Sequence, residues 1–80
     1  MKQKPLASLE YPMTDPEIQL TARESDVVKL IVQGLRYREI ADDLGLSYET
    51  VKTYVGRIRR KLSVSSKTEI ALWAVRNGIE

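Results

Sequence analysis

The segment from Ser47 to Leu62 holds the side chains of this chain that are best suited to bind a ligand. At 100° per residue, as in an α-helix, its apolar residues fall within about 40° of Val51 and form a narrow stripe. That stripe consists of Val51, Val55, Ile58 and Leu62. The side away from the stripe holds Lys52, Thr53, Gly56, Arg57 and Arg60. A helix with one buried apolar edge and one free cationic edge suits the major groove of double-stranded DNA.

Positive charge is concentrated in the same segment. From Tyr48 to Leu62 there are five basic residues and one acid, a net charge of +4, whereas the whole chain carries +2. Basic charge confined to one element is typical of a phosphate-binding surface. We expect Lys52 and Thr53 to contact base edges, and Arg57 to contact either guanine or phosphate. The basic run near the end of the helix predicts phosphate contacts by Arg60 and Lys61.

Gly56 is unusual because glycine inside a helix costs about 1 kcal/mol relative to alanine. One interpretation is close approach of the helix backbone to DNA at this point. The other is drift at an exposed position, and the sequence leaves both open.

Composition excludes several kinds of site. The 80 residues include no cysteine and no histidine, so disulfides, thiolate zinc sites and cysteine nucleophiles are excluded, together with the commonest general base. We therefore expect no enzyme, no catalytic residue, no metal site and no cofactor. No apolar run approaches the ~18 residues of a membrane span and no signal-peptide pattern is present, which favours a soluble cytoplasmic protein without a membrane partner.

Four helices are expected to position these side chains, and strand-like alternation is absent, so we predict an all-α fold. The first opens with Thr21 and Glu24 in a capping-box pattern and stops at Gly34. The second covers about residues 37–44 and ends at Gly45. Its start is poorly capped, and the free amides there could meet a phosphate. The third follows the N-cap Ser47 after a turn of three residues, which makes residues 37–62 a helix-turn-helix.

The fourth helix is expected to begin with a second capping box, Ser66 and Glu69, and to stop at residues 77–78. Residues 70–75 are six consecutive apolar residues, so two faces of this helix are apolar. We expect one face to pack on the domain and the other on a second copy, with Leu72, Trp73 and Val75 as dimerisation residues. Contact with residues 1–19 is the alternative. That stretch, interrupted by three prolines, is expected to be a flexible tail or linker before a domain at 20–80.

The chain resembles the LuxR/GerE-type helix-turn-helix DNA-binding domain over about residues 20–79. The similarity rests on the runs LTARESDVVKLIVQGL and EIADDLGLSYETVKTYVGRIRRKL. Their motifs are specific in combination: L-T-x-R-E, G-L, E-I-A, L-x-L-S-x-x-T-V-K and K-L. The resemblance implies a four-helix output domain of the kind found in NarL/FixJ-type response regulators and quorum-sensing regulators.

The resemblance also implies roles for particular residues. The third helix of the family enters the major groove and the fourth commonly pairs two subunits. The positions that match base-contacting ones are Lys52, Thr53 and Gly56. The positions that match phosphate-contacting ones are Thr50, Lys61, Arg36, Tyr37 and Arg38. The chain departs from the common pattern at Tyr54, at Gly56 and at residues 36–38, which leaves the target sequence and the phosphate anchoring open.

These observations predict a bacterial transcription regulator that binds double-stranded DNA as a homodimer, with RNA polymerase as a further candidate partner. Two copies would bind half-sites about one helical turn apart. Two alternatives stay open: a promoter-recognition domain like region 4 of sigma factors, and a protein-interaction module on the same fold. The tyrosines at 37, 48 and 54 could stack on DNA or lie flat on helix junctions.

Overall fold

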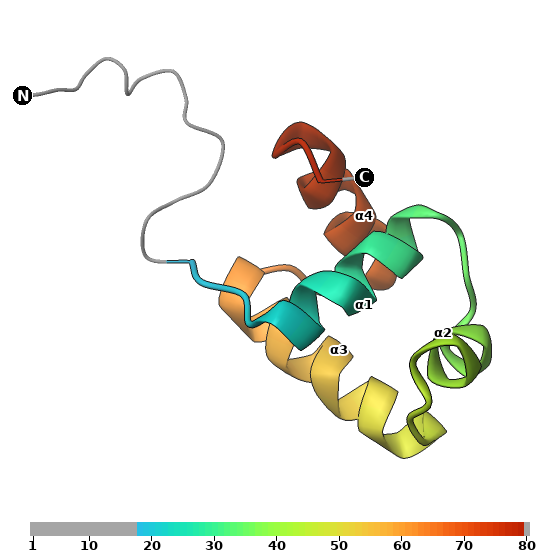
Figure 1. Cartoon of the computed structure of the whole chain (residues 1–80). Coiled ribbons are helices and arrows are strands. Elements are labelled where there is room, and N and C mark those ends of the chain that lie inside the picture. The colour runs from blue at the N-terminus through green and yellow to red at the C-terminus, as the bar shows by residue number, and fades with distance from the viewer. Residues whose placement is uncertain (1–17, 80) are drawn as a thin grey trace, which may run out of the picture.

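The computed structural model describes residues 18–79, which form four helices and, within that range, no strand (Figure 1). Their bounds are α1 Ala22–Val32, α2 Tyr37–Leu44, α3 Tyr48–Leu62 and α4 Lys67–Arg76. The all-α, four-helix prediction is therefore confirmed. Of the expected tail, residues 1–17 lie outside the described residues.

Local signals set most helix boundaries as expected. The Thr21 hydroxyl accepts from the Glu24 N–H at 3.1 Å, and Glu24 Oε1 accepts from the Thr21 N–H at 2.9 Å, which completes the predicted capping box. Gly45 ends α2 in the left-handed conformation at φ 69°, a backbone shape that glycine adopts without steric cost. The Ser47 hydroxyl caps α3 by accepting from the Thr50 N–H at 3.0 Å.

The start of α4 differs from the predicted capping box. Ser66 accepts from the Glu69 N–H as expected, but the Glu69 carboxylate bonds to the N–H and hydroxyl of Ser65, one residue further out. The hydrogen bond from the Ser65 N–H, and then that from its hydroxyl, lower the pKa of Glu69. The carboxylate thus fixes the turn that leads into the helix.

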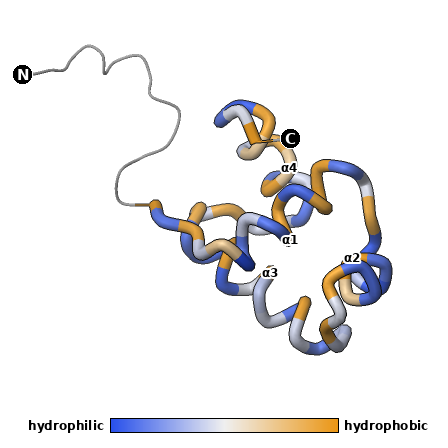
Figure 2. The backbone as a smooth tube through the Cα atoms, in the orientation of Figure 1, coloured by the Kyte–Doolittle hydropathy of each residue, from blue (hydrophilic) through white to orange (hydrophobic). Residues whose placement is uncertain are grey.

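One apolar core holds the four helices together. The predicted stripe of α3 is fully or almost fully buried, together with residues from all three other helices. Helix α1 packs against the other three helices, α2 also packs on α3, and α3 on α4. Figure 2 shows hydrophobic positions interspersed with hydrophilic ones along the helices, as expected when each buries only one side. The core therefore fixes which side of α3 faces outward.

Helix α4 has one buried face and one exposed face. Ile70 and Ala74 are completely buried, and Trp73 is half-buried against the core. Leu72 and Val75, at 50% and 56% exposure, are large apolar side chains left on the surface. The predicted division of α4 into two faces is found, with Trp73 on the side of the domain core.

Candidate nucleic-acid interface

The polar side of α3 lies on the surface. Lys52, Thr53, Arg57 and Arg60 are exposed, while Val51 and Ile58 on the same helix have no exposed surface. The apolar residues of α3, spaced three or four apart, are packed in the core. The helix therefore cannot turn its polar side inward without exposing these apolar residues to water. The residues expected to contact bases are thus presented together on one rigid element.

Two tyrosine rings support the cations of this side. The Lys52 ammonium lies 5.4 Å from the centre of the Tyr48 ring, and the Arg57 guanidinium lies 5.8 Å from the Tyr54 ring. Cation–π contacts of this kind contribute about 0.5–1 kcal/mol at exposed sites. They restrict the rotamers of Lys52 and Arg57 before any ligand arrives. These two side chains lie on opposite edges of the polar side.

Two threonine hydroxyls already have partners within the helix. Thr53 donates its hydroxyl proton to the carbonyl oxygen of Glu49 at 3.1 Å. This leaves the methyl group and the oxygen lone pairs of Thr53 for a ligand. Thr50 accepts from the Ser47 hydroxyl at 2.8 Å and retains its own proton to donate. Thr53 can therefore accept from a base or touch a methyl group, whereas Thr50 can donate to a phosphate.

Gly56 lies beside a surface hollow of about 410 Å³ between the end of α3 and the turn before α4. The lining residues are Gly56, Arg59, Arg60, Ser63, Val64 and Ser65. A Cβ placed on Gly56 would lie 3.9 Å from Arg60 Nη1, an ordinary contact distance. The helix has room for a side chain here, so packing within the chain does not require glycine at this position.

The start of α2 carries two arginines and a tyrosine. Arg36 offers no side-chain acceptor to the first turn, as predicted, but its own N–H donates to Glu39 Oε1 at 2.7 Å. Arg36 and Arg38 are exposed and Tyr37 is half-buried. Burial raises the pKa of the Tyr37 phenol, although the positive charge of Arg59 lowers it in part. Tyr37 is therefore a neutral hydroxyl donor at neutral pH.

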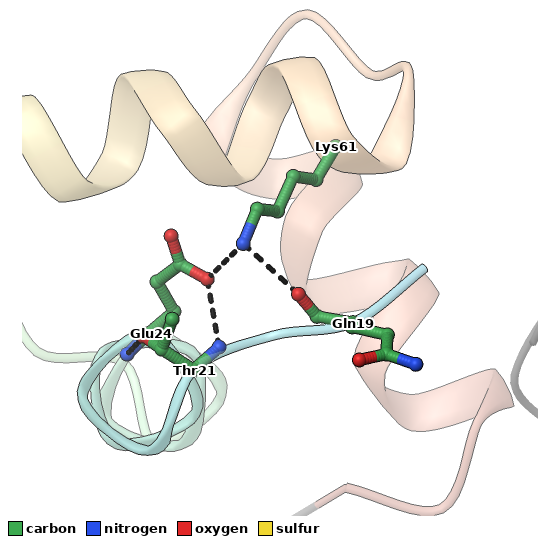
Figure 3. Close-up of polar contacts among 4 residues, drawn as sticks. All are labelled: Gln19, Thr21, Glu24 and Lys61. Carbon is green, nitrogen blue, oxygen red and sulfur yellow. Dashed lines mark hydrogen bonds and ion pairs between the residues drawn. The ribbon is translucent and has the colours of Figure 1, made fainter. Parts of the chain in front are cut away.

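Lys61 reaches from α3 to the first helix and to the segment before it (Figure 3). Its ammonium donates to Glu24 Oε1 at 2.7 Å and to the carbonyl oxygen of Gln19 at 2.9 Å. Glu24 is 2% exposed, so the pair joins a buried carboxylate to a cation at the protein surface. Two of the three ammonium protons of Lys61 are used inside the domain, which leaves one for a phosphate.

Sequence reasoning missed Lys67, the first residue of α4, whose ammonium lies 5.1 Å from the centre of the Tyr37 ring. The two residues are far apart in the chain, and no local pattern links them. A search for basic residues at every helix start would have found Lys67, although not its neighbour.

Residues 18–74 match the family described as bacterial regulatory proteins, luxR family. The chain is 42% identical over 59 residues to the uncharacterized transcriptional regulatory protein YxjL of Bacillus subtilis, which covers 74% of this chain and 27% of that protein. It is 40% identical over 62 residues to the transcriptional regulatory protein LiaR of the same organism, covering 78% of this chain and 29% of LiaR.

The nitrate/nitrite response regulator protein NarL of Escherichia coli is 44% identical over 55 residues, which cover 69% of this chain and 26% of NarL. The chain thus spans between about a quarter and a third of the length of these curated relatives. All three are regulatory proteins rather than enzymes, in agreement with the expectation from composition. None of the helices within residues 18–79 has the length and apolarity needed to cross a bilayer.

Proposed function

The chain belongs to the luxR family of bacterial regulatory proteins and is a DNA-binding domain of a transcriptional regulator. We propose that it recognises DNA by placing the polar side of α3 in the major groove. This membership favours the regulator over the sigma-factor and interaction-module alternatives. Residues 1–19 would then be a tail or linker ahead of the domain.

The observation that carries the proposal is the contrast between the two sides of α3. Its apolar stripe is sealed in the core, whereas Lys52, Thr53 and Arg57 are exposed on the opposite side. A helix that is anchored along one edge and free along the other can enter a groove of about 12 Å without rearrangement. The side chains that would meet bases project from the free edge.

We assign base contacts to Lys52, Thr53, Gly56 and Arg57. The Lys52 ammonium suits guanine O6 and N7, and the Thr53 methyl suits the methyl group of thymine. Arg57 can reach guanine or grip phosphate from its place over Tyr54. Gly56 would let the backbone of α3 approach the bases, because it has no side chain. Packing within the chain does not explain a glycine here, since a Cβ at this position would make only an ordinary contact with Arg60.

We assign phosphate contacts to the residues around the reading helix: Arg36, Tyr37, Arg38, Thr50, Arg60 and Lys61. The first three lie at the start of α2, where the first-turn N–H groups and the positive helix end also favour an anion. Lys61 would be the weakest of these contacts, because its ammonium is already paired with the Glu24 carboxylate at 2.7 Å. Thr50 retains a proton to donate.

A homodimer through α4 is part of the proposal. Leu72 and Val75 supply the exposed apolar surface, and Trp73 lies beside them with part of its ring on the core. Two copies paired in this way would bind half-sites about one helical turn apart. RNA polymerase, the further partner, would contact surfaces outside the DNA-facing side. Action on chromosomal DNA implies a cytoplasmic location.

Selection of bound duplexes from a random pool, followed by affinity measurements over a range of salt concentrations, tests the proposal. Lys52→Ala and Thr53→Ala should lower the preference for the selected duplex over a scrambled one by about 1–3 kcal/mol, or roughly 5- to 150-fold. Lys29→Ala, an exposed lysine on α1, is the matched control and should leave the preference unchanged. A folded wild-type chain that binds no duplex at any salt concentration would overturn the proposal and favour the interaction module.

A further inference from the structure

A hollow of about 390 Å³ lies where the starts of three helices meet. Its lining comes from the beginning of α2, the first residue of α3 and the first residue of α4. The lining residues are Arg36, Tyr37, Arg38, Tyr48 and Lys67. Within the described part of the chain, the backbones of α2 and α4 do not pack against each other. The Lys67 side chain bridges them by lying over the Tyr37 ring at 5.1 Å.

The hollow, which we call the α2–α4 hollow, is lined by three cations and no acid. The two ion pairs found among residues 18–79 are Arg23–Asp26 and Lys61–Glu24, and neither involves its lining. Glu39 lies nearby, but its Oε1 accepts from the Arg36 N–H, which is part of the backbone. Three positive charges gathered without a carboxylate partner repel one another and attract an anion from solution.

The lining also has directional donors. The Tyr37 and Tyr48 hydroxyls and the guanidinium groups of Arg36 and Arg38 all carry N–H or O–H donors of the kind that phosphate oxygens accept. Arg38 lies over the Tyr48 ring at 5.0 Å and Lys67 over the Tyr37 ring at 5.1 Å, so two of the cations are held in place beside the tyrosines. This arrangement fits a phosphate better than a carboxylate, since a phosphate accepts from several directions at once.

The hollow is continuous with the polar side of α3 through Tyr48. One tyrosine ring carries Arg38 at 5.0 Å and Lys52 at 5.4 Å. Lys52 is a proposed base contact, and Arg38 lines the hollow. A duplex with α3 in its major groove would therefore bring the phosphates of one strand to the hollow.

We infer that the α2–α4 hollow seats a backbone phosphate of DNA and that Lys67, from the fourth helix, is one of its contact residues. This inference rests on the proposed function and deepens it, because it adds α4 to the elements that touch DNA. Helix α4 would then contact the DNA backbone with its first residue and pair with a second copy through Leu72 and Val75, which follow five and eight residues later.

Charge removal at Lys67 tests the inference. We would compare Lys67→Gln with Lys29→Gln, an exposed lysine of α1 that makes the same change in net charge. Binding to a selected duplex and to a scrambled duplex would be followed over a range of salt concentrations. We expect Lys67→Gln to lower the slope of log affinity against log salt by about one unit. Because a phosphate carries no sequence information, the affinity should fall by the same factor on both duplexes.

Lys67→Arg should keep the wild-type slope, which separates loss of charge from loss of packing on Tyr37. Equal slopes and affinities for Lys67→Gln and Lys29→Gln would overturn the inference, provided that Lys52→Ala still weakens binding to the selected duplex. Failure of the wild-type chain to bind either duplex would instead overturn the proposed function. Thermal unfolding of each variant would confirm that the comparison is made between folded proteins.

Discussion

The Lys61 ammonium lies 2.7 Å from Oε1 of Glu24, although 37 residues separate the two in the chain. The same carboxylate oxygen accepts from the Thr21 N–H at 2.9 Å, and the same ammonium donates to the Gln19 carbonyl at 2.9 Å. The last turn of α3 is thereby tied to the first turn of α1 and to the segment before it. This contact orients α3 against the rest of the domain.

Lys61→Met should destabilise the domain by roughly 1–3 kcal/mol, because it leaves the Glu24 carboxylate buried without its cation. Urea unfolding would measure the change in the free energy of unfolding. Lys29→Met removes an exposed lysine of α1 and should change stability by less than about 0.5 kcal/mol. Equal stabilities of the two variants would contradict a structural role for the ion pair.

The pKa of Glu24 should respond to the same substitution. Burial raises this pKa, but the hydrogen bonds from Lys61 and Thr21 and the charge of Lys61 outweigh it, so the pKa lies below its usual value. A lowered pKa in the folded state stabilises the protein above the unfolded pKa, and this stabilisation is lost as the pH falls through the folded pKa. The wild type should therefore lose stability below about pH 4.

Lys61→Met removes the hydrogen bond and the charge that lower the pKa of Glu24, while burial still raises it. The pKa of Glu24 should therefore rise in this variant. Titration of the Glu24 carboxyl carbon by NMR would measure it, with Glu69, whose partners are on Ser65, as the internal control. An unchanged Glu24 pKa would show that Lys61 does not set the charge state of this carboxylate.

Gly56→Ala should raise the free energy of unfolding by about 1 kcal/mol, or the melting temperature by about 4–8 °C, because the new Cβ meets only Arg60 Nη1 at 3.9 Å. DNA affinity should fall or the preferred sequence should change, since the methyl group would stand where the backbone approaches the bases. Gly45→Ala is the contrasting variant, because φ 69° strains any residue with a Cβ and should lower stability. Unchanged DNA binding by Gly56→Ala would favour drift at an exposed position.

Leu72→Glu should abolish dimer formation while leaving the fold of the monomer intact, because half of this side chain is exposed in the single copy. Sedimentation at high micromolar concentration, with and without DNA, would measure the change in mass. Lys29→Glu supplies a charge change on α1, outside the proposed interface, and should keep the wild-type mass. A wild-type chain that stays monomeric both free and on DNA would contradict the dimer.

Local sequence signals were sufficient for the helices and for the orientation of α3. Thr21, Ser47 and Gly45 act on backbone groups within four residues of themselves, and the period of the apolar stripe is a property of one helix. The luxR-family resemblance, which the family match confirms, added the identity of the four-helix domain. The side of α3 that faces outward could therefore be predicted from the order of its residues alone.

Contacts between distant segments could not be predicted in the same way. Lys61 belongs by spacing to a basic run that suits phosphate, yet its ammonium is paired with Glu24 of another helix. Lys67 belongs to no motif in the sequence, and only the approach of the first residue of α4 to the start of α2 places it over Tyr37. Both depend on how helices pack, which the spacing of charges along the chain does not contain.

The turn between α2 and α3 has a consequence for target recognition. Only Gly45, Leu46 and Ser47 join the two helices, and both ends of this connection are fixed, by a left-handed glycine and by a capped first turn. This short connection therefore fixes the spacing between the arginines at the start of α2 and the exposed residues of α3. Lengthening the connection by one glycine would leave each helix intact but change the position of α2 relative to α3. The chain would then lose discrimination between DNA sequences while it kept nonspecific binding to DNA.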